Sequence, residues 1–134
     1  MQIAVQYARG GLPPYLRRRV HDYITSHLNQ KITNDALAQI AGLSTAYFYE
    51  VFKQTEGMSP HRYVLQYRMR RIQQLLASTE MSLAEIADAV GFCNQSHCIQ
   101  SFWKIFGVTP GEYRCYYRQG SDHADGAFKV SQSD

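Results

Sequence analysis

Residues 52–63 read FKQTEGMSPHRY, and residues 102–113 read FWKIFGVTPGEY. Both stretches begin with phenylalanine, pass a glycine and a Ser-Pro or Thr-Pro pair, and end in tyrosine. Upstream, LAQIAG at 37–42 matches IADAVG at 86–91. The offset is 49 in the upstream pair and 50 in the downstream pair, so one residue is inserted between them in the second copy. A chain that repeats itself at this period is built from two copies of one structural unit.

Helical patterns fill the first copy. After Pro13 and Pro14, apolar residues recur every four positions on one face of a helix that should end near Asn29 and Gln30. That apolar face consists of Leu16, Val20, Ile24 and Leu28. Thr33 or Asn34 can cap a short second helix, and Gly42 stands where a helix-ending glycine is expected.

A long helix and the second copy follow. Ser59 and Pro60 start a helix that should reach about Ser78, roughly 30 Å at 1.5 Å per residue. Capping boxes at Ser82 and Thr109 start two later helices. We predict an all-α fold of about seven helices, in which two helix-turn-helix subdomains (12–58 and 79–119) flank a connector helix (59–78). Residues 1–11 should be a linker remnant, and 120–134 a disordered tail.

Composition and charge limit the class of protein. Residues 12–118 carry twelve Lys and Arg against eight Asp and Glu, a net charge of +4, so the basic excess of the chain, whose net charge is +3, belongs to the helical body. A modest basic excess is compatible with an acidic partner but does not prove one. Three cysteines without paired spacing argue against a disulfide framework and favour a reducing compartment. No apolar run approaches the roughly 18 residues of a membrane span, so we expect a cytoplasmic protein with no membrane partner.

A short helix, a glycine turn and an amphipathic helix form a helix-turn-helix. In each copy the first helix braces the second through apolar residues, and the outer face of the second is left free for a major groove. The bracing residues are Leu37, Ile40 and Phe48 in the first copy and Ile86, Val90 and Phe102 in the second. Successive major grooves lie about 34 Å apart on one face of DNA, so a connector of similar length could serve two grooves without a dimer.

Over about residues 12–118 the chain resembles the AraC/XylS-type transcriptional regulators. The matching motifs are Leu37-Ala-x-x-Ala-Gly-Leu-Ser44, Phe52-Lys, Gly57-x-Ser-Pro-x-x-Tyr63, Arg68, Leu75-Leu76, Glu85-Ile-Ala-x-x-Val-Gly-Phe92, Gln95-Ser-His97, Phe102 and Gly107-x-Thr-Pro-x-x-Tyr-Arg114. The resemblance implies a bacterial, nucleoid-associated regulator, an activator, that binds double-stranded promoter DNA and contacts RNA polymerase. It also implies an N-terminal effector-binding or dimerisation domain, which is missing here, so we expect either the DNA-binding part of a longer regulator or a standalone member. We expect no cofactor, metal or catalytic residue.

The resemblance also implies the DNA-binding residues. The recognition helices would run from about Ser44 to Glu56 and from Asn94 to Phe106. Base-facing positions are Thr45, Ala46, Tyr47, Tyr49, Glu50, Asn94, Gln95, Ser96, His97, Ile99 and Gln100. Candidates for phosphate contacts are Ser44, Lys53, Ser59, Arg62, Arg70, Lys104, Thr109 and Arg114. The residue chemistry agrees in part, because glutamine can pair with adenine and Ala46 or Ile99 can contact a thymine methyl group.

Two departures leave alternatives open. The family often has arginine where Glu50 and Gln100 stand, and a carboxylate faces a repulsive phosphate field. Glu50 either accepts a hydrogen bond from cytosine or is merely solvated. The alternative function is a degenerate helix-turn-helix module that docks on RNA polymerase or another protein. Arg68 differs from the other arginines, because it lies on the buried stripe of the connector and should bond to carbonyls or a carboxylate.

A catalytic or metal-binding alternative rests on Cys93, His97 and Cys98. His97 and Cys98 are adjacent on a helix, so they point about 100° apart. The step from Cys93 to Cys98 is longer than the two-to-four spacing of a zinc knuckle. Cys98 also aligns with Phe48 in the repeat, which predicts a small core residue rather than a reactive one.

Overall fold

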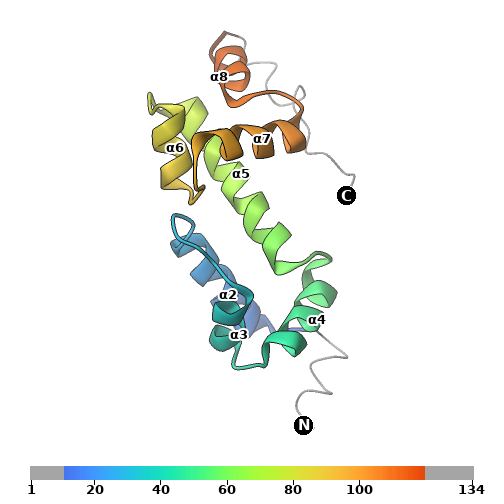
Figure 1. The fold of residues 1–134 in the computed structure, drawn as a ribbon. Coiled ribbons are helices and arrows are strands. Elements are labelled where there is room, and N and C mark those ends of the chain that lie inside the picture. Colours follow the sequence, from blue (N-terminus) through green and yellow to red (C-terminus); the bar gives the residue numbers. More distant parts are fainter. Residues whose placement is uncertain (1–10, 120–134) are drawn as a thin grey trace. The chain divides into compact units, whose positions relative to one another are not determined.

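The computed structural model describes residues 11–119, and within this range all regular structure is helical. The helices are α2 (Pro14–Ser26), α3 (Asn34–Ala41), α4 (Thr45–Glu56), α5 (Pro60–Ser78), α6 (Leu83–Ala89), α7 (Gln95–Phe106) and α8 (Pro110–Gln119), as Figure 1 shows. The predicted all-α fold is confirmed. None of these helices is both long and apolar enough to cross a membrane. The predicted tail, and the predicted linker apart from Gly11, lie outside the described residues.

The chain divides between Tyr67 and Arg68 into two compact units. We call residues 11–67 the first unit and residues 68–119 the second unit. The division falls within α5, so Val64 is buried in the first unit while Ile72 and Leu76 are buried in the second. The first part of the predicted connector therefore contributes to the core of the first unit, and the rest contributes to the core of the second unit.

The first unit is held together by apolar faces of α2, α3, α4 and the start of α5. Its buried cluster comprises Leu12, Leu16, Val20, Ile24, Leu37, Ala38, Ala41, Phe48, Val51, Phe52 and Val64. Full burial of a side chain of this size contributes about 1.5–3 kcal/mol. Figure 1 shows α3 beside α2, which agrees with their contacts. This packing fixes the inner face of α4 and leaves its outer face at the surface.

Helix α2 ends earlier than its apolar pattern predicts. The helix stops at Ser26, and Leu28 packs against the core from the following loop instead of from a helical turn. His27 explains the stop, because its Nδ1 bonds to the Tyr23 carbonyl at 2.8 Å, while its backbone N–H turns to Ile24. The Tyr23 carbonyl is therefore bonded to the His27 side chain and not to the backbone N–H that would bond to it in a continuing helix.

Two histidines that showed no partner pattern in the sequence have partners in the fold. The His27 ring also stacks on Tyr23, with ring centroids 4.0 Å apart. His21 on α2 shares a hydrogen bond between its Nε2 and the Tyr67 hydroxyl. Burial, with a hydrogen bond to Tyr67, raises the pKa of the Tyr63 hydroxyl, so Tyr63 is a packed tyrosine with a polar partner.

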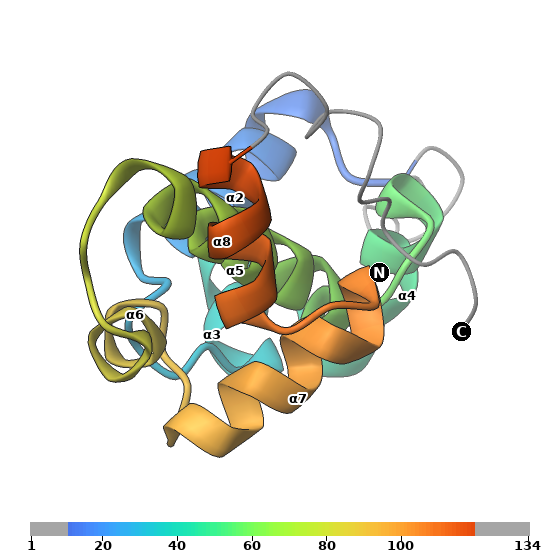
Figure 2. The same ribbon diagram turned by 90° about the horizontal axis from the view of Figure 1, so that it is seen from above.

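The second unit repeats this arrangement with other side chains. Its buried residues are Met69, Ile72, Leu76, Ile86, Ala87, Val90, Phe92, Cys98, Phe102, Phe106 and Tyr113. Figure 2 shows α8 next to α7 from above. Phe102 meets the edge of Tyr113 at 5.7 Å, as Phe52 meets Tyr63 at 5.2 Å.

The turns between the paired helices locate the inserted residue. Gly42 and Gly91 both have left-handed backbones, with φ of 72° and 83°. In each copy the next N–H bonds back five residues, from Leu43 to Ala38 and from Phe92 to Ala87. Ser44 then caps α4 directly after Leu43, whereas Cys93 intervenes before the cap of α7. The extra residue of the second copy is therefore Cys93, in the turn itself.

The chain enters the first unit against the end of α4. Gly11 is buried with φ of 75°, and a Cβ built there would lie 2.4 Å from Oγ1 of Thr55. The neighbouring Leu12 N–H donates to the same oxygen at 2.8 Å, and this oxygen donates to the Val51 carbonyl. The last predicted linker residue is therefore an ordered part of the first unit.

Candidate nucleic-acid interface

The outer face of α4 exposes Thr45, Ala46 and Glu50, while Tyr49 is half-buried. The exposure follows from the packing of Phe48 and Phe52 on the opposite arc, since helical neighbours on one face are three or four residues apart. The Thr45 hydroxyl donates to Oδ1 of Asp35 on α3 at 2.7 Å. Thr45 therefore has its donor engaged within the protein and keeps only acceptor capacity for a base.

The structure revises the predicted base contact of Tyr47. Its ring packs against the core of the first unit, and its hydroxyl is buried with no hydrogen-bond partner among residues 11–119. The backbone N–H of Tyr47 donates to Ser44 Oγ at 3.3 Å, which caps α4. A buried hydroxyl cannot reach a base edge. Tyr47 therefore anchors α4 to the core of the first unit instead of contacting DNA.

The outer face of α7 exposes four predicted base contacts: Gln95, Ser96, His97 and Gln100. Ile99 is half-buried beside them. Asn94 lies just before the helix, where its Oδ1 accepts the His97 N–H at 2.8 Å. This bond leaves the Asn94 side-chain NH₂ group available as a donor. The His97 ring lies edge-on to Phe92 with centroids 5.2 Å apart, which orients it at the start of the helix.

The two recognition helices differ in charge. Helix α4 carries Glu50, Lys53 and Glu56, whereas Lys104 is the only Lys, Arg, Asp or Glu in α7. Glu56 is paired with Nε of Arg17 on α2 at 2.7 Å, and this hydrogen bond raises the pKa of the Arg17 guanidinium. The outer face of α7 therefore carries less negative charge than that of α4, and a phosphate beside it would meet less repulsion.

The helix starts predicted to meet phosphate also differ. Ser59 Oγ accepts the Arg62 N–H at 3.3 Å, and the first turn of α5 has no acidic residue. Thr109 and Glu112 form a complete capping box, with bonds of 2.9 and 3.1 Å. The Glu112 carboxylate already occupies the positive end of α8, so an anion is better accommodated at α5.

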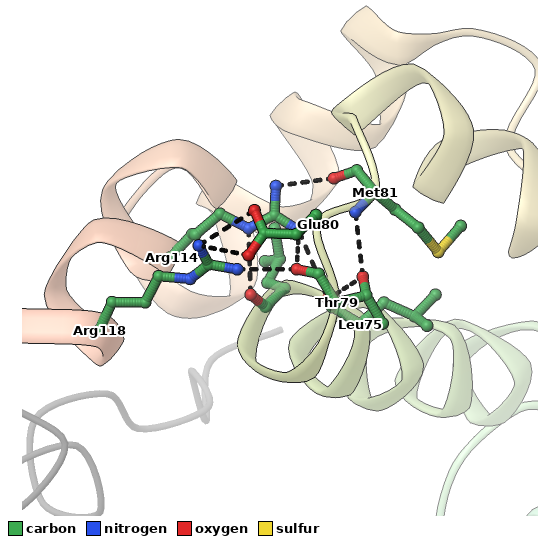
Figure 3. Close-up of polar contacts among 7 residues, drawn as sticks. Leu75, Thr79, Glu80, Met81, Arg114 and Arg118 are labelled. Carbon is green, nitrogen blue, oxygen red and sulfur yellow. Dashed lines mark hydrogen bonds and ion pairs between the residues drawn. The ribbon is translucent and has the colours of Figure 1, made fainter.

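Arg114 does not serve as a free phosphate contact. Its guanidinium donates to the carbonyls of Leu76 (3.0 Å), Met81 (2.7 Å), Thr79 (3.1 Å) and Leu75 (3.4 Å). Figure 3 shows it directed into the turn after α5. The final carbonyls of a helix have no partner within the helix, so a planar fork of donors is well suited to them. The predicted phosphate contact is replaced by this structural role.

Arg118 extends the same network. Its Nη2 donates to the Thr79 carbonyl at 2.8 Å, and its Nη1 lies 3.0 Å from Oε2 of Glu80 (Figure 3). Arg68, for which bonding to carbonyls or a carboxylate was predicted, is half-buried, and burial lowers the pKa of its guanidinium. Among the remaining phosphate candidates, Lys53, Arg70 and Lys104 are exposed and Arg62 is half-buried.

The three cysteines differ in exposure. All three are free, with Cys93 and Cys115 exposed and Cys98 buried. Burial raises the pKa of the Cys98 thiol to about 11, so it stays protonated at neutral pH. Within residues 11–119, no group of three His, Cys, Asp or Glu side chains could hold a metal ion.

Comparisons with known proteins identify the family. A family model described as a helix-turn-helix domain matches residues 37–115. A solved regulator from Chromobacterium violaceum, described as AraC-type DNA-binding, matches with a TM-score of 0.71 and 28% identity, over 76% of this chain and 91% of that chain. The chain belongs to the AraC-type helix-turn-helix family.

Two further relatives are transcriptional regulators by their descriptions. The DNA-binding domain of AdpA, solved in complex with a target DNA, has a TM-score of 0.73 at 27% identity, over 78% of this chain and 93% of that chain. The probable transcriptional regulator LumQ of Photobacterium leiognathi is 35% identical over 74% of this chain but only 40% of its own length. The chain spans roughly a third to two fifths of the length of the curated relatives it matches first.

Sequence reasoning missed interactions that involve backbone groups or distant side chains. The carbonyl contacts of Arg114 have no pattern in the sequence, although its place in the AraC-type motif marked it as important. The bond from Thr45 to Asp35 joins two helices of one helix-turn-helix, and only the turn geometry reveals it. An exposed Trp103 on the outer part of α7 was also missed, because aromatic residues in helices are usually buried.

Proposed function

We propose that this chain is the sequence-specific DNA-binding part of a bacterial transcription activator, which places α4 and α7 in adjacent major grooves of a promoter. The observation that supports this best is the duplicated surface. In each unit a helix of the same length is capped at the same position, buried on one face and exposed along the other. The AdpA domain, a structural relative, was solved with its target DNA.

Base reading is assigned mainly to exposed side chains of α7. Gln95 and Gln100 can each form two hydrogen bonds with adenine, and Asn94 and His97 can donate to purine acceptors. Ser96 and Ile99 complete that face. On α4, Ala46 and Tyr49 offer mostly apolar contacts, Thr45 offers an acceptor, and Glu50 suits a cytosine amino group. We therefore propose that α7 discriminates bases more strongly than α4.

Phosphate contacts are assigned to exposed cations and to the start of α5. Lys53 and Lys104 lie on the recognition helices, and Arg70 lies on α5. Ser44 and Ser59 mark helix starts whose own first turns contain no acidic residue, although the Asp35 carboxylate lies beside Thr45 at the start of α4. Thr109 is a weaker candidate because of Glu112. In the full regulator we propose an accompanying effector-binding or dimerisation domain, contact with RNA polymerase, and action in the cytoplasm at the nucleoid.

The test is selection of a binding site from random DNA, followed by titration of the selected duplex at several salt concentrations. About six phosphate contacts predict a log–log slope near −5. Hydroxyl-radical footprints should show two protected segments about one helical turn apart on one face. A flat salt dependence contradicts DNA binding, while a single protected segment contradicts the use of two grooves and favours a module that docks mainly on protein.

Two variants separate base reading from phosphate contact. Gln95→Ala should lose about 1–3 kcal/mol of discrimination at one base pair, and Lys53→Ala should weaken all sequences alike and reduce the slope by about one. The matched controls are Gln74→Ala on α5 and Lys31→Ala in the loop before α3, both exposed and outside the recognition helices. Equal losses in the variants and their controls would contradict the assignment.

A further inference from the structure

Trp103 is an exposed aromatic residue on a recognition helix. It is the only tryptophan of the chain, and 57% of its surface is exposed, although Phe102 beside it is fully buried. Isolated exposed apolar residues are common and carry no meaning by themselves. Two further observations, the groove around Trp103 and the residue at the corresponding position of the first unit, indicate a binding role for this side chain.

Trp103 lines a surface groove of about 480 Å³ along α7. Ile99 adds apolar surface to the groove, His97 and Gln100 add polar groups, and Lys104 adds a positive charge. None of the seven lining residues is acidic. A groove with apolar walls, hydrogen-bonding groups and a cation fits a partner that has both apolar surface and negative charge, as the sugar-phosphate strand of DNA does.

The first unit shows what lies at the same position on α4. The offset of 50 pairs Trp103 with Lys53, which extends over the ring of Tyr49 at 5.7 Å. Lys53 is an exposed cation, and the proposed function assigns it to a phosphate contact. The second unit therefore presents an indole where the first presents an ammonium group.

We propose that Trp103 packs its indole against a deoxyribose at the edge of the major groove that α7 enters, with its Nε1–H directed to an adjacent phosphate. This inference rests on the proposed function. Trp103 replaces an ionic contact with an apolar one, and burial of apolar surface releases no counterions. The second unit thus gains affinity at this position that salt does not weaken, whereas the affinity gained by Lys53 falls as salt rises.

Since Trp103 is the only tryptophan, its fluorescence reports on this position alone. Acrylamide quenching of the chain should fall several-fold on addition of the selected duplex, while the anisotropy of labelled DNA reports binding in the same sample. DNA binding with unchanged quenching overturns this inference and leaves the proposed function intact. Absence of DNA binding overturns the proposed function itself. Protection of Trp103 only by added RNA polymerase overturns the inference in favour of a protein partner.

Substitutions give a second measurement. Trp103→Ala should lower affinity about tenfold with an unchanged salt slope. Trp103→Lys should recover affinity at low salt and steepen the slope by about 0.9. Tyr15→Ala is the matched control, because Tyr15 is 62% exposed and lies on α2, outside the recognition helices. Unchanged affinity in Trp103→Ala, or a loss in Trp103→Ala that Tyr15→Ala equals, overturns the inference.

Discussion

Phe52 in the first unit and Phe102 in the second occupy corresponding positions, but their aromatic neighbours lie on opposite sides. Phe52 packs on Phe48, four residues earlier, with centroids 5.5 Å apart. Phe102 packs on Phe106, four residues later, at 4.6 Å. The position of Phe48 is taken by Cys98, and the position of Phe106 by Glu56, which is paired with Arg17.

The comparison shows what the repeat must keep and what it can exchange. Both copies keep the capping residues, the left-handed glycines and the contact between phenylalanine and tyrosine, because these determine the backbone. Aromatic volume can move by two helical turns as long as the core stays filled. Where the first unit buries Val64, the second has Arg114, which bonds to backbone carbonyls.

The exchange of core volume predicts the largest effect. Phe48→Ala should destabilise the first unit by about 3–5 kcal/mol, whereas Cys98→Ala at the corresponding position should cost only about 1 kcal/mol, because far less buried volume is lost. Denaturant unfolding monitored by circular dichroism measures both. Similar costs for the two variants would show that the units do not differ in where their core volume lies.

Arg114 predicts the next effect. Arg114→Ala removes bonds to four carbonyls and should cost about 2–3 kcal/mol, with increased amide exchange in residues 68–119. Arg118→Ala, which removes one carbonyl bond and an exposed ion pair, should cost about 0.5–1 kcal/mol. Equal costs would contradict the structural role assigned to Arg114.

A smaller effect concerns Gly11, whose contact belongs to the first unit. Gly11→Ala combines a left-handed backbone with a clash against Thr55 and should cost more than the roughly 1–2 kcal/mol of backbone strain alone. Gly57→Ala has a similar φ of 77° but nothing within 4 Å of the new Cβ, so it isolates the strain. The difference between their thermal midpoints measures the contact, and no difference would show that the contact does not restrain the chain.

The smallest effect is expected at the ion pair that takes the place of an aromatic contact. Glu56→Gln should cost about 0.5–1 kcal/mol, because water screens the charge of Arg17, whose side chain is 54% exposed, although that of Glu56 is only 8% exposed. The cost should disappear at about 1 M salt, where charges are screened within roughly 3 Å. A cost that persists in high salt would indicate that packing, rather than charge, holds Glu56 in place.

Local patterns predicted most of the fold. Ser82, Thr109 and the glycines that end helices act through neighbours in the sequence, so their effects can be read without a structure. Interactions between distant residues could not be read in this way. The burial of the Tyr47 hydroxyl depends on how α4 packs in the core, and the partner of His21 is a tyrosine 46 residues away.

For the candidate site, too, local patterns could be predicted and interactions between distant residues could not. Helical spacing and the family resemblance together predicted which positions lie on the outer faces, and Ala46, Glu50, Gln95 and Gln100 are indeed exposed. Spacing cannot show whether an exposed group is already engaged, as Thr45 is by Asp35. Arg114 was misassigned for a related reason, because its partners are carbonyls, which every residue carries.

The carbonyl contacts of Arg114 also bear on the order in which the protein forms during synthesis. Every buried residue of the first unit has been made once the ribosome passes Val64, so that core can close early. The end of α5 and the turn after it remain without their cap until Arg114 leaves the exit tunnel, 33 residues after Met81. Since N-terminal regions fold first during synthesis, the second unit is completed only when α8 has been made.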